Sequence, residues 1–201
     1  DVGIIDPETN EPVFFTENTT GAEETYLVNE SNGEYEFRVY YPSEDEKVAF
    51  IYKYTLDALV TNYKDTAELN RKIIGTNTDY RMDVTAEIIL PTIVSNREDF
   101  RTWAHGAPQG EIYQIERSGR SIATITVPNN PANQFVEVQI LFPTALTPNN
   151  PNVVDQDRKE EIIEAQETAR LVELENYESS RKNLSYWIIA IIAAMIIGPL
   201  F

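Results

Sequence analysis

The sequence predicts an all-β protein, an antiparallel β-sandwich ectodomain followed by an α-helical stalk and one transmembrane helix. Three observations predict this order. Polar and apolar residues alternate with period two in several runs of the middle of the chain, which is typical of half-buried strands. A stretch rich in Glu, Ala, Leu and Arg follows, where good helix formers predominate. The last 18 residues, 184–201, carry no charge and are rich in Ile and Ala.

Composition narrows the possible functions. The chain has 201 residues, of which 42% are hydrophobic, so it can build a core. It contains no cysteine and one histidine, which excludes disulfides, thiolate nucleophiles and multi-histidine metal sites. Its net charge of −17 argues against nucleic acid as a partner, because phosphate binding requires clustered Lys and Arg. We therefore expect no metal site and no cofactor.

The acidity is concentrated at the N-terminus. Residues 1–46 hold thirteen acidic residues and one basic residue, whereas residues 47–154 hold eleven acidic and ten basic residues. We interpret residues 1–46 as an acidic N-terminal segment of the ectodomain whose charge keeps the surface solvated. The alternative is a surface that attracts cations, for calcium or a basic partner, although the sequence has no calcium-loop pattern.

Residues 47–146 are expected to form the β-sandwich core. Hairpin turns are expected at Ser31-Asn32-Gly33 and at Ser118-Gly119. The segment 65–74 is compatible with either a strand or a short helical turn. Longer strands are predicted over 34–41, 47–59, 79–90 and 134–142, and shorter ones over 25–29, 111–116 and 121–127.

A linker and a helix are predicted next. Residues 147–154 begin with TPNNPN, and two prolines among polar residues predict a linker. Residues 155–183 are predicted to form a juxtamembrane helix. Either Asp155 or Asp157 can cap it, and Glu160 stands at capping-box spacing from Asp157.

Residues 184–201 are predicted to be the transmembrane helix, so a lipid bilayer is an expected partner. As a helix they would span about 27 Å, close to the thickness of a bilayer core. Tyr186 and Trp187 stand at the start of the segment, and Arg181 and Lys182 come just before it. Aromatic and basic side chains are typical of this position, so we expect these four residues to lie at the membrane interface.

Five short segments of the chain form a recognisable series of motifs. They are Phe50-Ile51-Tyr52-Lys53-Tyr54, Asp65-Thr66-Ala67-Glu68-Leu69 with Ile74-Gly75, Ile88-Ile89-Leu90-Pro91, Trp103 to Gly110, and Val136 to Pro143. In their order and spacing these segments resemble one family, the YciQ-like predicted bacterial membrane proteins, which are catalogued as domain of unknown function 2207. The resemblance covers roughly residues 35–201. It implies a cell-membrane protein with an extracytoplasmic N-terminal domain, a signal peptide upstream and membrane helices downstream. The family has no established activity, so it implies no catalytic residues.

The segment WAHGAPQG supplies the candidate binding loop, with Trp103, His105, Gly106 and Gly110 as its residues. Histidine side chains often act in acid–base catalysis, so His105 between Trp103 and Gly106 is compatible with a catalytic role, but no nucleophile motif accompanies it. The structural interpretation, which we favour, is that Trp103 fills the core while His105 hydrogen-bonds the backbone of a tight loop.

Two other groups of residues admit a functional interpretation. Asp65, Glu68, Glu98 and Asp99 could provide paired carboxylates for glycoside hydrolysis. Capping and surface charge explain them as well. Five tyrosines could form an aromatic platform that binds sugar or peptide, or they could pack in the core and along the edges of the sandwich. They are Tyr40, Tyr41, Tyr52, Tyr54 and Tyr63.

We expect a non-enzymatic domain that binds or scaffolds an extracytoplasmic protein or wall component at the bacterial cell envelope. The alternatives are a carbohydrate-active hydrolase that uses paired carboxylates, and a sensor domain that responds to divalent cations. No residue is assigned a catalytic or metal-binding role.

Overall fold

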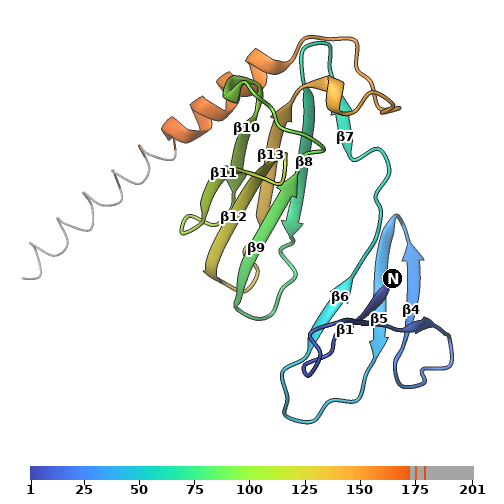
Figure 1. The fold of residues 1–201 in the computed structure, drawn as a ribbon. Helices are drawn as coiled ribbons and strands as arrows, with labels where there is room; N and C mark the ends of the chain where they lie inside the picture. Colours follow the sequence, from blue (N-terminus) through green and yellow to red (C-terminus); the bar gives the residue numbers. More distant parts are fainter. Residues whose placement is uncertain (173–174, 176–178, 180–201) are drawn as a thin grey trace, which may run out of the picture. The chain divides into compact units, whose positions relative to one another are not determined.

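The computed structural model describes residues 1–172, 175 and 179. Strands predominate in it, and a helix at residues 159–172 follows them (Figure 1). The all-β expectation is therefore confirmed. The chain divides into two compact units, Asp1–Asp57 (unit 1) and Ala58–Phe201 (unit 2).

Unit 1 contains two three-stranded sheets. In the first, β1 (Val2–Ile5) lies between β2 (Pro12–Phe14) and β6 (Ala49–Tyr52) and is antiparallel to both. In the second, β4 (Thr25–Ser31) pairs antiparallel with β5 (Glu34–Tyr40) and parallel with the short β3 (Thr16–Glu17). The β4–β5 hairpin turns at Asn32 and Gly33, both with positive φ, so this predicted turn is confirmed.

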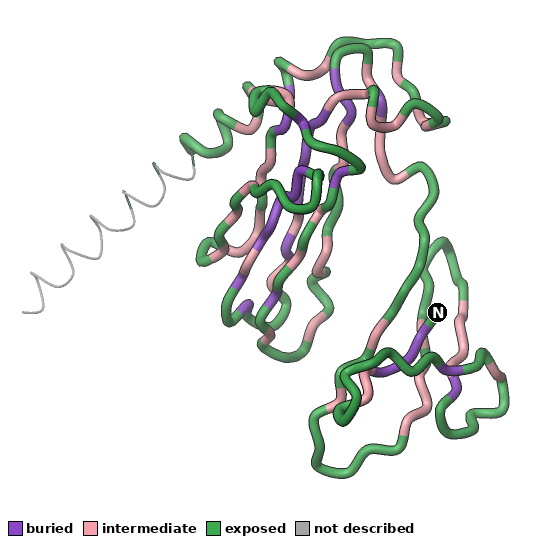
Figure 2. Tube along the Cα trace, viewed as in Figure 1, coloured by how far each residue is buried: buried purple, intermediate pink, exposed green. Residues whose placement is uncertain are grey.

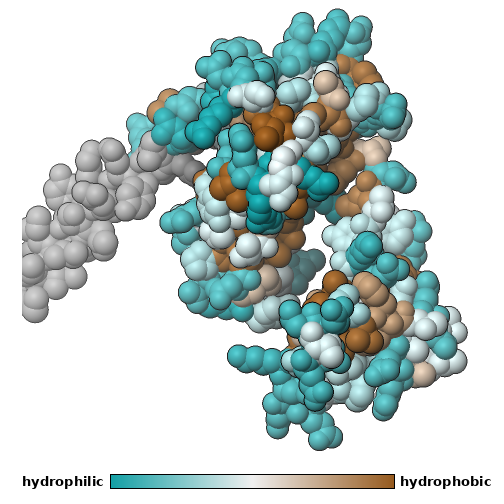
Figure 3. All heavy atoms as spheres, viewed as in Figure 1, coloured by the Kyte–Doolittle hydropathy of each residue, from teal (hydrophilic) through white to brown (hydrophobic). Residues whose placement is uncertain are grey.

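Aromatic rings join the two sheets of unit 1. Tyr41 stacks on Phe15 at 5.8 Å between ring centroids and meets Phe50 edge-on at 6.1 Å. Phe37 of β5 meets Tyr52 of β6 edge-on at 5.8 Å. The fully buried aliphatic part of this core is small, and large apolar side chains reach the surface of the unit (Figure 3). The core of unit 1 is therefore mainly aromatic and partly exposed.

Unit 2 contains a four-stranded and a three-stranded sheet, both fully antiparallel. The order of the first is β10-β13-β8-β7, and that of the second is β11-β12-β9. The β11–β12 hairpin turns at Ser118 and Gly119, as predicted. The strands are β7 (Val60–Asn62), β8 (Ala67–Ile74), β9 (Met82–Ile89), β10 (Arg101–His105), β11 (Glu111–Arg117), β12 (Arg120–Asn130) and β13 (Val136–Phe142).

The two sheets of unit 2 share one hydrophobic core. Ile125 of β12 and Ile140 of β13 are both fully buried, and their strands carry the longest buried stretches (Figure 2). Along β13, Val136, Val138 and Ile140 face the core, and the residues between them lie on the outer face of the four-stranded sheet. That outer face is where the C-terminal helix lies.

The segment that follows β13 folds back on β7. Asn62 is 8% exposed, and its side-chain oxygen accepts hydrogen bonds from Thr147 Oγ1 at 2.8 Å and Asn150 Nδ2 at 3.0 Å. The backbone of Asn62 accepts from the N–H of Val154, and Asn62 also forms a parallel bridge with Val153. The Pro/Asn-rich residues 147–154, which the sequence predicted to be a linker, are therefore held by hydrogen bonds against β7 within unit 2.

The strands do not form the single β-sandwich that the sequence predicted, because they belong to four sheets in two units. The alternating run 47–59 accounts for this difference. Alternation of polar and apolar residues indicates an extended segment with one apolar face, but it does not specify which strand that segment pairs with. Only Ala49–Tyr52 of the run pairs in a sheet, with β1.

The predicted transmembrane segment, 184–201, lies outside the described residues. Among the residues that are described, no helix is both long and apolar enough to cross a membrane.

Candidate functional site

The C-terminal helix is fixed to unit 2 by a side chain distant in sequence. The carboxylate of Asp65 accepts hydrogen bonds from the backbone N–H groups of Arg158 and Lys159, at 2.9 and 3.0 Å. These N–H groups have no partner within the helix, and the positive end of the helix dipole favours a carboxylate there. Asp65 therefore provides the cap that the sequence assigned to Asp155 or Asp157.

An ion pair holds the same end of the helix. Lys159 Nζ lies 2.5 Å from Asp99 Oδ1, and Asn96 Nδ2 donates to the other carboxylate oxygen at 3.1 Å. The hydrogen bond from the Lys159 ammonium keeps the pKa of Asp99 below its ordinary value. This pair joins the helix to the short 3-10 turn η1 (Arg97–Asp99) that precedes β10.

Farther along the helix, a chain of side-chain hydrogen bonds crosses the outer face of the four-stranded sheet. Gln166 of the helix donates to Gln139 of β13, which in turn donates to Glu68 of β8. Tyr63 donates to the same carboxylate at 3.1 Å. Burial, and then the Glu68 carboxylate, raise the pKa of Tyr63.

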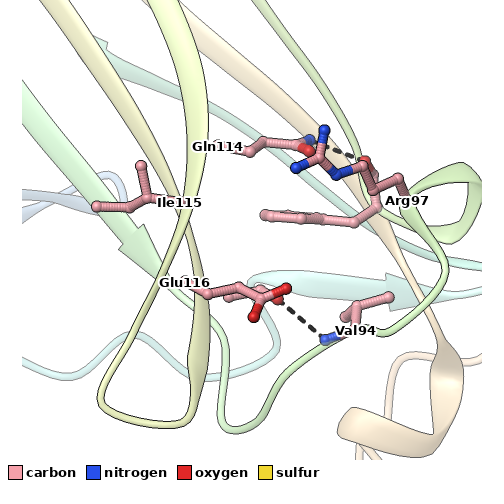
Figure 4. A pocket seen from close by; sticks show the side chains of 7 residues that line it. Val94, Arg97, Gln114, Ile115 and Glu116 are labelled. Atoms are coloured by element: carbon pink, nitrogen blue, oxygen red, sulfur yellow. Dashed lines mark hydrogen bonds between the residues drawn. The ribbon is translucent and has the colours of Figure 1, made fainter.

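A groove opens between the free edges of the two sheets, at β10 and β11. It consists of two adjoining cavities of about 270 and 520 Å³, and we call it the edge groove. Arg97, Phe100 and Gln114 line both cavities. The smaller cavity is completed by Val94, Ile115, Glu116 and Ser121 (Figure 4), and the larger by Arg101, Thr102, Trp103, Ile163 and Glu167.

Gln114 connects the two sheet edges that border the edge groove. Its side-chain nitrogen donates to the carbonyl of Phe100 at 2.8 Å and to Thr102 Oγ1 at 3.2 Å, so it ties β11 to β10. Figure 4 shows the side chains of Gln114 and Arg97 extending toward each other at one side of the smaller cavity, with Glu116 on the other. The smaller cavity is therefore lined by a guanidinium, a carboxylate and the buried ring of Phe100.

The helix contributes one wall of the larger cavity through Ile163 and Glu167. The opposite wall is β10, where Arg101 and Trp103 lie two positions apart on the same face. A molecule bound in this cavity would touch both the sheet and the helix.

The predicted binding loop is divided between a strand and a turn. Trp103 and His105 lie in β10, opposite Gln139 and Glu137 of β13. Both are half-buried on the outer face, so Trp103 does not fill the core between the sheets. Within the described part of the chain, the imidazole of His105 makes no hydrogen bond. Trp103 reaches the edge groove, and His105 is not among the residues that line it.

The two glycines of the predicted loop have structural roles. Gly106 has φ of +103°, and a Cβ atom there would lie 2.2 Å from the carbonyl oxygen of Phe135. At Gly110 a Cβ atom would lie 3.1 Å from both the Ala107 carbonyl oxygen and a methyl group of Val127. Both positions therefore require a close approach of the backbone.

The four carboxylates considered for glycoside hydrolysis have separate surroundings. Asp65 and Asp99 both line a cavity of about 220 Å³, together with Lys159. However, Asp65 is bonded to backbone N–H groups and Asp99 to the ammonium. Glu68 belongs to the hydrogen-bond chain, and Glu98 is exposed. In residues 1–172, 175 and 179, no three His, Cys, Asp or Glu side chains are grouped in a way that could hold a metal ion.

The tyrosines of the expected aromatic platform belong to both units. Tyr63 belongs to unit 2, whereas the other four belong to unit 1. Within unit 1, Tyr41 and Tyr52 make the core ring contacts described above, and Tyr54 contacts Phe37 at 6.5 Å. The candidate interface residues Arg181, Lys182, Tyr186 and Trp187 lie outside the described residues.

Sequence reasoning did not identify Arg97, Arg101 or Gln114 as site residues. The sequence contained only a weak indication of a site there, because two arginines four positions apart are common in a charged surface segment. The edge groove depends on how two sheet edges and a helix meet, which the local pattern does not encode.

The family comparison agrees with the resemblance found in the sequence motifs. A family model for the N-terminal domain of a predicted membrane protein (DUF2207) matches residues 5–142. The match starts well before residue 35 and includes strands of both units. No curated protein and no solved structure matches the chain.

Proposed function

This chain belongs to the DUF2207 family of predicted membrane proteins, and from that premise we propose that it is a non-enzymatic binding domain of the bacterial cell envelope. In this proposal, residues 184–201 cross the membrane and units 1 and 2 lie on the extracytoplasmic side. The two sheets of unit 2 act as a sandwich that carries the edge groove.

One observation supports the binding role above the others. The larger cavity of the edge groove has β10 as one wall and the helix at 159–172 as another. That helix precedes the apolar segment 184–201 in the sequence. An occupant of the groove would therefore bridge the folded domain and the element that leads toward the proposed membrane anchor.

The surroundings of Asp65 and Asp99 favour a binding role over glycoside hydrolysis. A glycosidase needs one carboxylic acid with a raised pKa to protonate the leaving group. The pKa of Asp99 is instead lowered by the Lys159 ammonium. Asp65 accepts two backbone hydrogen bonds, which suit a structural cap rather than a proton donor.

Single-cysteine labelling tests the proposed orientation, because residues 1–201 contain no cysteine. Ser43 and Thr76 are exposed residues of units 1 and 2. We expect Ser43→Cys and Thr76→Cys to react with a membrane-impermeant maleimide in intact cells. Labelling that requires permeabilised cells would place the domain on the cytoplasmic side and contradict the proposal.

The non-enzymatic part of the proposal has its own test. Full-length protein in mild detergent would be incubated with purified wall polysaccharide while new reducing ends are measured. We expect no release above that of a heat-denatured sample. Hydrolysis that Asp99→Asn abolishes and Glu98→Gln retains would establish the hydrolase alternative instead.

A further inference from the structure

We propose that the edge groove binds an extended acidic peptide, with a carboxylate of the peptide held by Arg97 and Arg101. This inference rests on the proposed binding function and adds the chemical class of the ligand.

The guanidinium groups of Arg97 and Arg101 are largely unpaired. Among the described residues, Arg97 makes no side-chain hydrogen bond or ion pair, and Arg101 makes only one weak bond, from Nε to the Glu98 carbonyl at 3.4 Å. Arg117 and Arg170 are paired with Glu87 and Glu167, each at 2.6 Å. Among the described residues, Arg71, Arg81 and Arg120 also lack a side-chain partner, but they do not line the edge groove. Two unpaired guanidinium groups in one groove of a chain with net charge −17 offer a site for a carboxylate, which guanidinium binds in bidentate geometry.

Apolar side chains and one amide oxygen complete the lining of the edge groove. Phe100 is 4% exposed and Trp103 is half-buried, and Ile163 adds an aliphatic wall. These side chains suit an apolar residue next to the carboxylate. Gln114 uses its nitrogen within the protein, while its oxygen accepts no hydrogen bond from the described residues and can accept one from a peptide N–H.

The carboxylates of the edge groove favour a peptide over an acidic polysaccharide. Glu116 lines the smaller cavity, and Glu167, which is paired with Arg170, lines the larger one, so each part of the groove contains a carboxylate as well as Arg97. A polymer with a carboxylate on every sugar would bring some of them close to these two groups. A peptide can carry one or two acidic side chains with neutral residues between them, and it avoids that repulsion.

The test uses full-length protein in mild detergent and a fluorescein-labelled hexapeptide, Ala-Phe-Glu-Leu-Glu-Ala, with anisotropy as the readout. We expect saturable binding that weakens as salt is added. The same peptide with both Glu replaced by Gln should bind at least about tenfold more weakly, because it lacks the charge-assisted hydrogen bonds.

Variants place the binding in the groove. Arg97→Ala combined with Arg101→Ala should weaken binding by about tenfold or more, whereas Arg120→Ala, an exposed arginine at the β11–β12 turn, should leave it unchanged. Circular dichroism would show that each variant retains its strands. Arg97→Lys combined with Arg101→Lys keeps the charge without the bidentate geometry and should give an intermediate affinity.

Several results would overturn the inference. They are no binding of the acidic peptide at millimolar concentration, equal binding of the Gln peptide, or equal binding by the double alanine variant. Competition by trigalacturonic acid at a lower concentration than the unlabelled peptide would also overturn it, in favour of a sugar ligand. None of these results bears on the maleimide labelling, so failure of this inference is distinguishable from failure of the proposed location.

Discussion

Asp65 and Lys159 are 94 positions apart in the chain, yet the carboxylate of Asp65 accepts a hydrogen bond from the backbone N–H of Lys159 at 3.0 Å. The same carboxylate accepts from Arg158. The first turn of the helix is thus completed by a residue from the loop between β7 and β8. The helix is part of unit 2 at this end, and its position depends on that loop.

Removal of this cap should destabilise the protein. Asp65→Ala leaves two N–H groups of the helix start without their acceptor, and we expect a loss of about 1–2 kcal/mol in the free energy of unfolding. Asp157→Ala is the matched control, because Asp157 is exposed and its carboxylate makes no hydrogen bond among the described residues. Urea denaturation of the full-length chain, followed by circular dichroism, measures both. Equal losses in the two variants would contradict the assignment of the cap.

The Asp99–Lys159 pair should make stability depend on acid pH. The folded state lowers the pKa of Asp99, so ionised Asp99 stabilises the fold above its ordinary pKa of about 3.9. This stabilisation is lost as pH falls through the lower pKa of the folded state. We expect the stability difference between wild type and Asp99→Asn to be present at pH 6 and to shrink toward pH 2–3. Thermal unfolding at several pH values measures it, with Glu98→Gln as the exposed control, and a difference that does not change with pH would exclude the ion pair as its cause.

Gly106 should not tolerate a side chain. Its φ of +103° and the 2.2 Å approach of the Phe135 carbonyl oxygen to a Cβ atom predict that Gly106→Ala costs about 2–4 kcal/mol of stability. Gly75 is the control, because a Cβ atom there has no neighbour within 4 Å and its φ is not positive. Gly75→Ala should stay within about 0.5 kcal/mol of the parent in the same denaturation experiment. A mild effect at Gly106 would mean that the β10–β11 connection can rearrange.

Asn62 should be required for the segment after β13 to stay bound. Asn62→Ala removes the acceptor for Thr147 Oγ1 and Asn150 Nδ2 and the donor to the Thr147 carbonyl. Leaving partly buried polar groups unpaired should cost about 2 kcal/mol. Asn77→Ala, at an exposed residue, should have little effect. Hydrogen exchange would also show faster exchange at the Val154 amide in the Asn62 variant, and unchanged protection there would refute this role.

The sequence predicted those parts of the fold that short-range signals encode. The residues Asn32-Gly33 and Ser118-Gly119 adopt positive φ, so both turns could be recognised from residue type alone. The alternating runs over 79–90 and 134–142 correspond to β9 and β13. In these places the local preference and the tertiary structure agree.

Other features depend on contacts between distant residues and could not be predicted in the same way. Trp103 and His105 were assigned to a loop because of the glycines that follow, but pairing with β13 makes them part of β10. The cap of the helix was sought next to it in sequence, where Asp155 and Asp157 are available, and it is supplied by Asp65. The edge groove likewise requires β10, β11 and the helix to be placed before Arg97 and Arg101 can be seen to share it.

The bonds between Asn62 and the residues around Val153 close unit 2 upon itself. The chain enters through β7 and passes the same point again after β13, with the Asn62–Val153 bridge between the two passages. The two ends of this segment therefore lie next to each other. Because of this, the strands could be connected in a different order along the chain and still form the same two sheets. This can be tested with a circular permutant of residues 60–156. It would begin at Gly119, end at Ser118 and join residue 156 to residue 60 by a short linker, and it should keep both sheets and their shared core.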